Sequence, residues 1–262
     1  MRLYLAFARR GFGRAAAYPG ATVAGAFTNT VFGFINVAIL LALFKQRAQA
    51  GGYDAQDAVT YVWVTQGLLM PVAIFGWFEL ALRIRSGDIA IDLCRPLDVQ
   101  LSGLAFDLGR AVFDLIFRGV PPLVVGAIVY GVRTPSAPLA LAFLVSVAMA
   151  VAISFGFRFL YNLAAFWLLD YRGAAMLALL VSWLLSGLYA PIGLFPDWLR
   201  TIAQVLPFSG MIQIPVDVWL GKHEGPALAG ILAVQAFWIV VLLGVGRAVF
   251  GQAVRRVVVQ GG

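Results

Sequence analysis

The charged residues of this chain concentrate in one stretch, residues 84–98, which reads IRSGDIAIDLCRPLD. Charge is scarce elsewhere, because 62% of the 262 residues are hydrophobic and 12% are charged, against roughly 45–50% and about 25% in a soluble domain. Within the stretch, Ile89 and Ile91 alternate with Asp88 and Asp92. A free loop would expose these apolar side chains to water, so the pattern predicts an element that docks onto another protein. The alternative is an ordinary solvated loop.

The secondary structure of this stretch stays open between a strand and a short helix. The two aspartates belong to an alternating pattern, yet they also stand four residues apart, so the period fits both structures. Gly87 can turn the chain at the start of the stretch, and Pro96 suits the first position of a following helix.

A second set of charged residues, Asp107, Arg110, Asp114 and Arg118, recurs at steps of three, four and four. This spacing places them on one face of a helix and predicts ion pairs along it. Arg158 interrupts another apolar run, and it lies either within a membrane span or near the inner interface.

The residue types that catalysis or metal binding would need are sparse. The single histidine, His223, stands between Lys222 and Glu224, and Cys94 is the only cysteine. No Cys/His cluster suggests a metal site, and no GxxxxGK[ST] phosphate loop is present. We therefore expect no catalytic residue, no metal and no nucleotide hydrolysis in this chain.

The surrounding apolar runs predict a membrane protein. Each run is long enough for a helix to cross a hydrocarbon core, which takes about 20 residues, and helices satisfy their own backbone groups there. We predict one all-α integral membrane domain over residues 1–262, with about six transmembrane helices. The expected spans are residues 21–44, 58–82, a third run whose purely apolar part is 119–131, 139–157 with apolar character continuing to 169, 173–190, and 227–250.

Two further segments flank or separate the spans. In residues 1–20 the arginines fall on one side of a helix and apolar residues on the other, which predicts an N-terminal amphipathic helix at the membrane surface. A short basic overhang is the alternative. Residues 191–226 are too polar to span and too apolar for a watery loop, so we predict a re-entrant pair of short helices, the first opened by Pro196 and ended by Pro207. An irregular loop with interfacial aromatics is the alternative.

The basic residues predict the orientation, because Lys and Arg collect on the cytoplasmic side. With both termini in the cytoplasm, five of the 19 basic residues fall outside and the other fourteen inside. The five are Lys45, Arg47, Arg133, Arg200 and Lys222. The net charge of +7 is thus explained by membrane orientation, and we expect no nucleic-acid partner. This orientation places residues 84–98, within a loop over 83–103, in the cytoplasm.

The chain resembles the permease, or transmembrane, subunits of ABC-2 type exporters, particularly a bacterial group of ABC permeases of about this length. The resemblance rests on the N-terminal interfacial helix, on WFELALRIRSGDIAIDLCRPLD after the second span, on LFPDWLRTIAQVLPF after the fifth, and on the six-span plan. It implies that the loop over 83–103 contains a coupling helix seated in a cleft of a separate ATP-hydrolysing subunit. The residues that it assigns to this connection are Arg85, Gly87, Asp88, Ile89, Asp92, Arg95 and Pro96.

The resemblance also implies partners and a location. ATP and Mg would be bound by the partner ATPase, with no cofactor in this chain, and a second permease half, identical or homologous, would complete the transporter in the lipid of the bacterial inner membrane. The substrate would be amphipathic, lipid-like or a drug, leaving between the two halves. The segment over 191–226 would lie near the outer gate, with Phe195, Pro196, Trp198, Pro207 and Phe208. Asn29, Asn36 and Gln66 are polar residues within spans, suited either to the path or to helix packing. A secondary transporter and a non-catalytic structural membrane subunit are the alternative functions.

Overall fold

The computed structural model describes residues 2–45, 48–168 and 170–255. Arg47, one of the five basic residues expected outside, lies beyond these described ranges. The regular elements within them are helices, and Ala50 and Tyr53 add one isolated β-bridge. The predicted all-α class is therefore confirmed.

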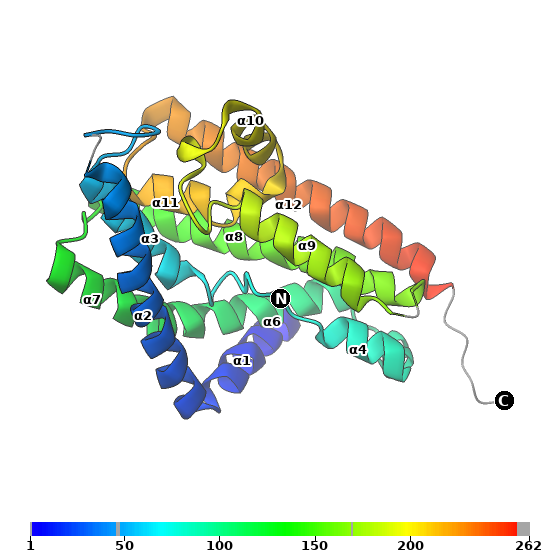
Figure 1. Cartoon of the computed structure of the whole chain (residues 1–262). Helices are drawn as coiled ribbons and strands as arrows, with labels where there is room; N and C mark the ends of the chain where they lie inside the picture. Colours follow the sequence, from blue (N-terminus) through cyan, green and yellow to red (C-terminus); the bar gives the residue numbers. More distant parts are fainter. Residues whose placement is uncertain (1, 46–47, 169, 256–262) are drawn as a thin grey trace.

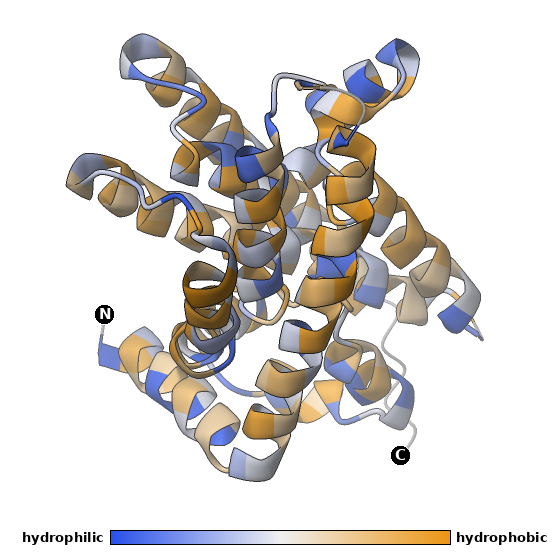
Figure 2. Cartoon of the chain, turned by 60° about the vertical axis from the view of Figure 1, so that its left-hand side comes forward, coloured by the Kyte–Doolittle hydropathy of each residue, from blue (hydrophilic) through white to orange (hydrophobic). Residues whose placement is uncertain are grey.

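Four helices are long and apolar enough to cross a membrane within the described residues. They are α2 (Pro19–Phe44), the continuous rod of α6 (Val99–Asp114), η1 (Leu115–Gly119) and α7 (Val120–Tyr130), then α8 (Ala137–Leu163) with η2 (Ala164–Phe166), and α12 (Gly225–Val254). At about 1.5 Å per residue each is about 40 Å or longer, against about 30 Å of hydrocarbon. Figure 2 shows hydrophobic residues along these helices and hydrophilic residues gathered at helix ends and loops.

The span expected over residues 58–82 is not formed by one continuous helix. α3 (Ala55–Leu68) ends after 14 residues, irregular chain follows, and α4 (Glu79–Ser86) begins beyond it. Pro71 lies in the interruption and removes a backbone donor, and Gly76 there has a φ of 88°, which an L side chain rarely adopts. The fifth predicted span is also short, because α9 (Arg172–Leu185) has 14 residues.

α3 is enclosed by the rest of the chain, because its residues from Asp57 to Leu68 are all buried. Asp54 and Asp57 form a capping box at its start, and Trp63 in its middle is fully buried. Gly33 of α2 and Gly126 of α7 face the Trp63 ring so closely that a Cβ at either position would collide with it. These two glycines therefore make room for the largest side chain of the core.

One end of the molecule carries the shorter helices α1 (Arg2–Ala16), α4 and α5 (Ile89–Leu93). α1 lies beneath α6 in Figure 1 and packs against it with the two backbones in contact. A Cβ at Gly11 would collide with the carbonyl of Phe106, and one at Gly109 would collide with that of Ala8. The predicted amphipathic helix is thus present, and the two glycines allow its backbone to lie in contact with that of α6.

The opposite end carries the pair of short helices expected between the last two predicted spans. α10 (Asp197–Val205) begins directly after Pro196 and ends before Pro207, as predicted. The 3-10 turns η3 (Ile192–Leu194) and η4 (Pro207–Gly210) flank it, and α11 (Gln213–Trp219) completes the segment. α10 and α11 lie at the top of Figure 1, whereas α1 and α4 lie towards the bottom.

Candidate functional site

The conspicuous charged stretch of the sequence forms the short helix α5 at the same end of the molecule as α1 and α4, so of the two predicted structures the helix is the one present. Gly87 caps α4 in the left-handed conformation, with a φ of 80°. This conformation suits glycine and reverses the chain, so α5 projects from the molecule between α4 and α6.

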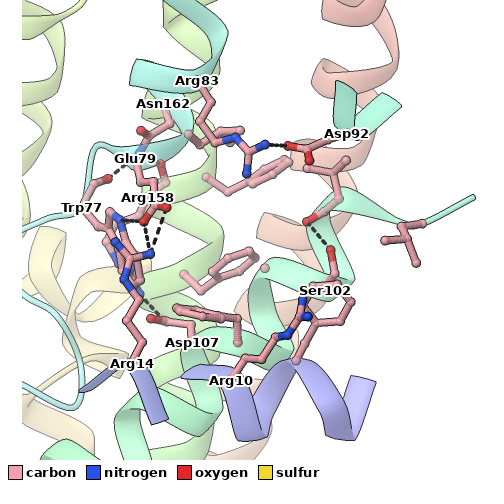
Figure 3. A pocket seen from close by; sticks show the side chains of 18 of the residues that line it. Arg10, Arg14, Trp77, Glu79, Arg83, Asp92, Ser102, Asp107, Arg158 and Asn162 are labelled. Atoms are coloured by element: carbon pink, nitrogen blue, oxygen red, sulfur yellow. Dashed lines mark hydrogen bonds and ion pairs between the residues drawn. The ribbon is translucent and has the colours of Figure 1, made fainter. Parts of the chain in front are cut away.

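α5 is fastened to its neighbours by ion pairs. Arg83 of α4 reaches Asp92 of α5 at 2.6 Å (Figure 3). Asp98 caps α6 by accepting from the Leu101 amide at 2.9 Å, and it also binds Arg247 of α12 at 2.6 Å. A displacement of α5 would therefore pass to α4 through the Arg83–Asp92 ion pair, and to α6 and α12 through the chain that leads from α5 to Asp98.

The residues predicted to couple to an ATPase divide into an outward group and an anchoring group. Ile89 is 1% exposed and packs within the chain, whereas Ile91 is 56% exposed. Asp92 is partly buried by its ion pair with Arg83. The remaining predicted coupling residues are exposed, namely Arg85, Gly87, Asp88, Arg95 and Pro96. The outward surface of α5 thus consists of charges around one exposed isoleucine.

A cavity of about 350 Å³ lies behind α5, between α1, α4, α6 and α8. Figure 3 shows basic side chains entering it from α1 and α4, with aromatic rings on its walls. Arg14 of α1 binds both carboxylate oxygens of Glu79, at 3.0 and 2.9 Å. The Arg14 guanidinium also lies 5.9 Å from the Trp77 ring centre. These contacts join the N-terminal helix to the start of α4.

A buried charge network lies deeper, on α6 and α8. The carboxylate of Asp107 is bound by Arg110 at 2.8 Å and also by Arg158 of α8. Arg110 binds Asp114 at 2.5 Å, and Arg118 binds Asp114 at 3.5 Å. The ion pairs expected along this helix face are confirmed. Sequence reasoning missed the partner on α8, since a helical period identifies neighbours only on the same helix.

Arg110 also stabilises the interruption after α3. Its guanidinium donates to the carbonyl oxygens of Met70 and Pro71, at 2.8 and 2.9 Å. Backbone carbonyls at a broken helix need other donors when they are buried. Pro71 within a predicted span was the available sequence signal for this break.

The same interrupted chain is fastened to α8 by Asn162. Its side-chain oxygen accepts from the Ala81 amide at 2.9 Å, and its nitrogen donates to the Trp77 carbonyl at 2.8 Å. Polar contacts therefore run from α5 through Arg83 and α4 to α8, and from α8 through Asp107 to the break after α3.

Two of the three uncharged polar residues predicted for the path or for packing come together. Asn29 of α2 donates to the backbone carbonyl of Gln66 of α3 at 3.2 Å, and both residues are 3% exposed. Asn36 is half-buried elsewhere on α2. The Asn29 contact favours helix packing for this pair.

The predicted gate residues do not form one cluster. Pro207 and Phe208 are buried, and the Phe208 ring packs edge-on against Phe157 of α8 at 5.0 Å. Pro196 and Trp198 are exposed at the start of α10, and Phe195 is half-buried. Their role as a gate stays a prediction. Within the described ranges, no group of three or more His, Cys, Asp or Glu side chains is placed to hold a metal ion.

A comparison with protein families identifies the architecture. The family model described as ABC-2 family transporter protein matches residues 30–261. No curated protein and no solved structure matches the chain. The family match covers most of the chain, including the four long apolar helices from within α2 onward and the projecting helix α5. The chain is therefore a multi-pass membrane permease that belongs to the ABC-2 family of transporter proteins.

Proposed function

We propose that this chain is the transmembrane half of an ATP-driven exporter and that α5 is its contact with the ATPase subunit. The single observation that carries the proposal is the projecting helix α5, which is exposed outward and fastened inward. Ile91 offers an apolar contact to a partner, while the Arg83–Asp92 and Arg247–Asp98 ion pairs tie the base of the projection to α4 and α12.

The proposed orientation places α5 in the cytoplasm of a bacterial inner membrane, with both termini on the same side. The basic residues support it, because Arg14, Arg83 and Arg247 gather at the end that carries α5, whereas Arg133 and Lys222 meet at Asp57. The four long helices give four passes. The segment from α3 to α4 would form one more pass and α9 another, which makes six. The short helices α10 and α11 would then form the re-entrant segment near the outer gate.

The proposed mechanism follows from these tethers. ATP and Mg are bound by the ATPase subunits, whose closure displaces α5, and this chain itself performs no hydrolysis. The displacement passes through α4 to Asn162 on α8 and through Asp98 to α6 and α12. A second permease half, identical or homologous, supplies the other wall of the path. A ligand shifts an equilibrium between two conformations only if it binds one of them more tightly than the other. In this proposal ATP is that ligand, and it binds more tightly to the closed arrangement of the ATPase subunits.

The proposal is tested by changing the outward surface of α5 without disturbing its anchors. Ile91→Asp places a charge where the ATPase would bury an apolar side chain, and burying such a side chain contributes about 1.5–3 kcal/mol. We expect the ATPase subunit recovered with the affinity-purified permease to fall at least about tenfold. ATP-driven transport in reconstituted vesicles should fall with it.

Leu168→Asp is the matched control. Leu168 is an aliphatic residue that is 42% exposed between α8 and α9, so the same polarity change is made outside α5. This variant should keep ATPase recovery. Equal loss in both variants, or normal recovery and transport with Ile91→Asp, would contradict the role of α5.

A further inference from the structure

A second cavity, of about 390 Å³, lies at the opposite end of the molecule from α5. One wall is apolar, formed by Ile192, Ile214, Ile231 and Val234, and another is polar, with Tyr53, Gln213 and Asp217. The volume falls within the range of small-molecule sites, which are largely apolar with a few fixed polar groups.

Asp217 is held in place on the polar wall by neutral donors. Its two carboxylate oxygens accept from the Tyr53 hydroxyl at 2.5 Å and from the Gln213 amide nitrogen at 2.8 Å. The Gln213 side-chain oxygen accepts from the Tyr61 hydroxyl at 3.0 Å and from the Ile192 amide at 2.8 Å. Gln213 therefore has a fixed orientation, and so does the carboxylate that it supports.

The neighbouring carboxylates have cationic partners, and Asp217 does not. Asp57 binds Lys222 at 2.6 Å and Arg133 at 2.8 Å, and Arg133 also binds Asp54 at 2.7 Å. Among the described residues, no Lys, Arg or His forms an ion pair with Asp217 within 4.0 Å.

Two acids, Asp54 and Asp57, thus share the two fixed cations, and Asp217 at the cavity has no ion pair among the described residues. Lys222 and His223 also border the cavity, but they lower the pKa of the Asp217 carboxyl by less than burial raises it. A ligand cation would supply the missing charge.

We propose that this cavity binds an amphipathic organic amine, with its ammonium against Asp217 and its apolar body against Ile214, Ile231 and Val234. A carboxylate has about four lone-pair sites, and only two are occupied here. An ammonium would add charge-assisted hydrogen bonds to the free sites. The inference rests on the proposed function in assigning amines as the transported class, because a site at the outer end of an exporter would hold substrate before release.

Binding can be measured on the purified full chain in bilayer discs of neutral lipid. The probe is 2-phenylethylammonium, and 2-phenylethanol is the uncharged compound of similar size; both are titrated by calorimetry. We expect saturable binding of the amine and at least about tenfold weaker binding of the alcohol. Asp217→Asn should weaken amine binding at least about tenfold and leave the alcohol unaffected.

Asp197→Asn is the matched control, because Asp197 lies on α10 at the same end with its side chain 89% exposed. It removes the same charge away from the cavity and should leave amine binding unchanged. Val234→Phe fills the apolar wall without touching the hydrogen bonds of Asp217, so it should weaken amine binding about tenfold even if Asp217→Asn fails to fold. The proposal is overturned if the wild type shows no saturable amine binding, if Asp197→Asn weakens binding as much as Asp217→Asn, or if both Asp217→Asn and Val234→Phe bind normally.

The failure of this inference is distinguishable from failure of the proposed function. Binding in discs requires no ATPase, whereas ATP-driven movement of the same amine into vesicles requires both subunits. Amine binding without ATP-driven transport would support the site and contradict its role in export. ATP-driven transport of other amphiphiles by a chain that binds no amine would overturn the site and leave the proposed function standing.

Discussion

At the scale of single residues, most of the buried charged side chains among the described residues lie in one network around Asp107. This carboxylate lies between Arg110 on its own helix and Arg158 on α8, and its side chain is 2% exposed. Arg110 binds one carboxylate oxygen of Asp107 and Arg158 binds the other, so loss of Arg158 leaves a buried carboxylate oxygen without its donor, which costs more than the loss of an exposed pair. The network should therefore control the stability of the helix bundle.

Arg158→Met is expected to lower the free energy of unfolding by about 2–3 kcal/mol, because Asp107 keeps Arg110 and loses one charge-assisted hydrogen bond. Arg247→Met is the control, because it removes another pair between helices, that with Asp98, whose arginine side chain is 68% exposed. This change should cost about 1 kcal/mol or less. Denaturant titration of both variants in the same bilayer discs checks the difference. Equal losses of unfolding free energy would show that burial does not make the Arg158 ion pair more important for stability than the exposed pair.

The sequence predicted one part of this network and missed another, for a physical reason. The row from Asp107 to Arg118 follows helical spacing, so its internal ion pairs could be predicted from the sequence alone. The partner Arg158 and the carbonyls of Met70 and Pro71 come from other segments. Only tertiary packing brings these groups to Arg110 and Asp107, and the spacing of residues along one helix does not reveal contacts with other segments.

At the scale of elements, helix boundaries set by proline were predictable, and close approaches set by glycine were not. α10 lies between Pro196 and Pro207 as expected, because proline restricts the backbone locally. Gly11 and Gly109 permit α1 to lie directly on α6. A glycine in a single sequence has several possible explanations, so Gly11 and Gly109 could not be recognised as contact positions. The amphipathic pattern therefore predicted the helix α1 but not its packing against α6.

The docking of α1 can be tested with two glycines of the same helix. A Cβ at Gly11 would collide with the Phe106 carbonyl, whereas one at Gly13 would meet no atom within 4 Å. We expect Gly11→Ala to destabilise the contact by about 1–3 kcal/mol through overpacking. Gly13→Ala should stabilise the helix by about 0.5–1 kcal/mol. Hydrogen exchange of the α1 amides should become faster in the first variant only, and slower exchange in both would mean that α1 is not seated through Gly11.

At the scale of the whole molecule, the apolar runs located the first and the last of the long helices within a few residues. The run over 21–44 corresponds to Pro19–Phe44, and the run over 227–250 corresponds to Gly225–Val254. The broken second run could not be separated from a true span by hydropathy, because hydropathy does not distinguish apolar residues buried in protein, as those of α3 are, from residues that face lipid. The family match supplies the permease identity, while orientation rests on the distribution of basic residues.

Orientation and docking can be tested together with Cys94, the single cysteine of the chain. Cys94 is exposed directly after α5, so a membrane-impermeant maleimide should label it in inside-out vesicles and not in intact spheroplasts. The double variant Cys94→Ser, Glu224→Cys moves the thiol to the exposed loop before α12, and it should show the reverse pattern. Bound ATPase subunit should slow labelling of Cys94 and leave the double variant unaffected, because only α5 would be covered. Labelling of Cys94 from outside would invert the orientation, and unchanged labelling beside bound ATPase would place the subunit contact away from α5.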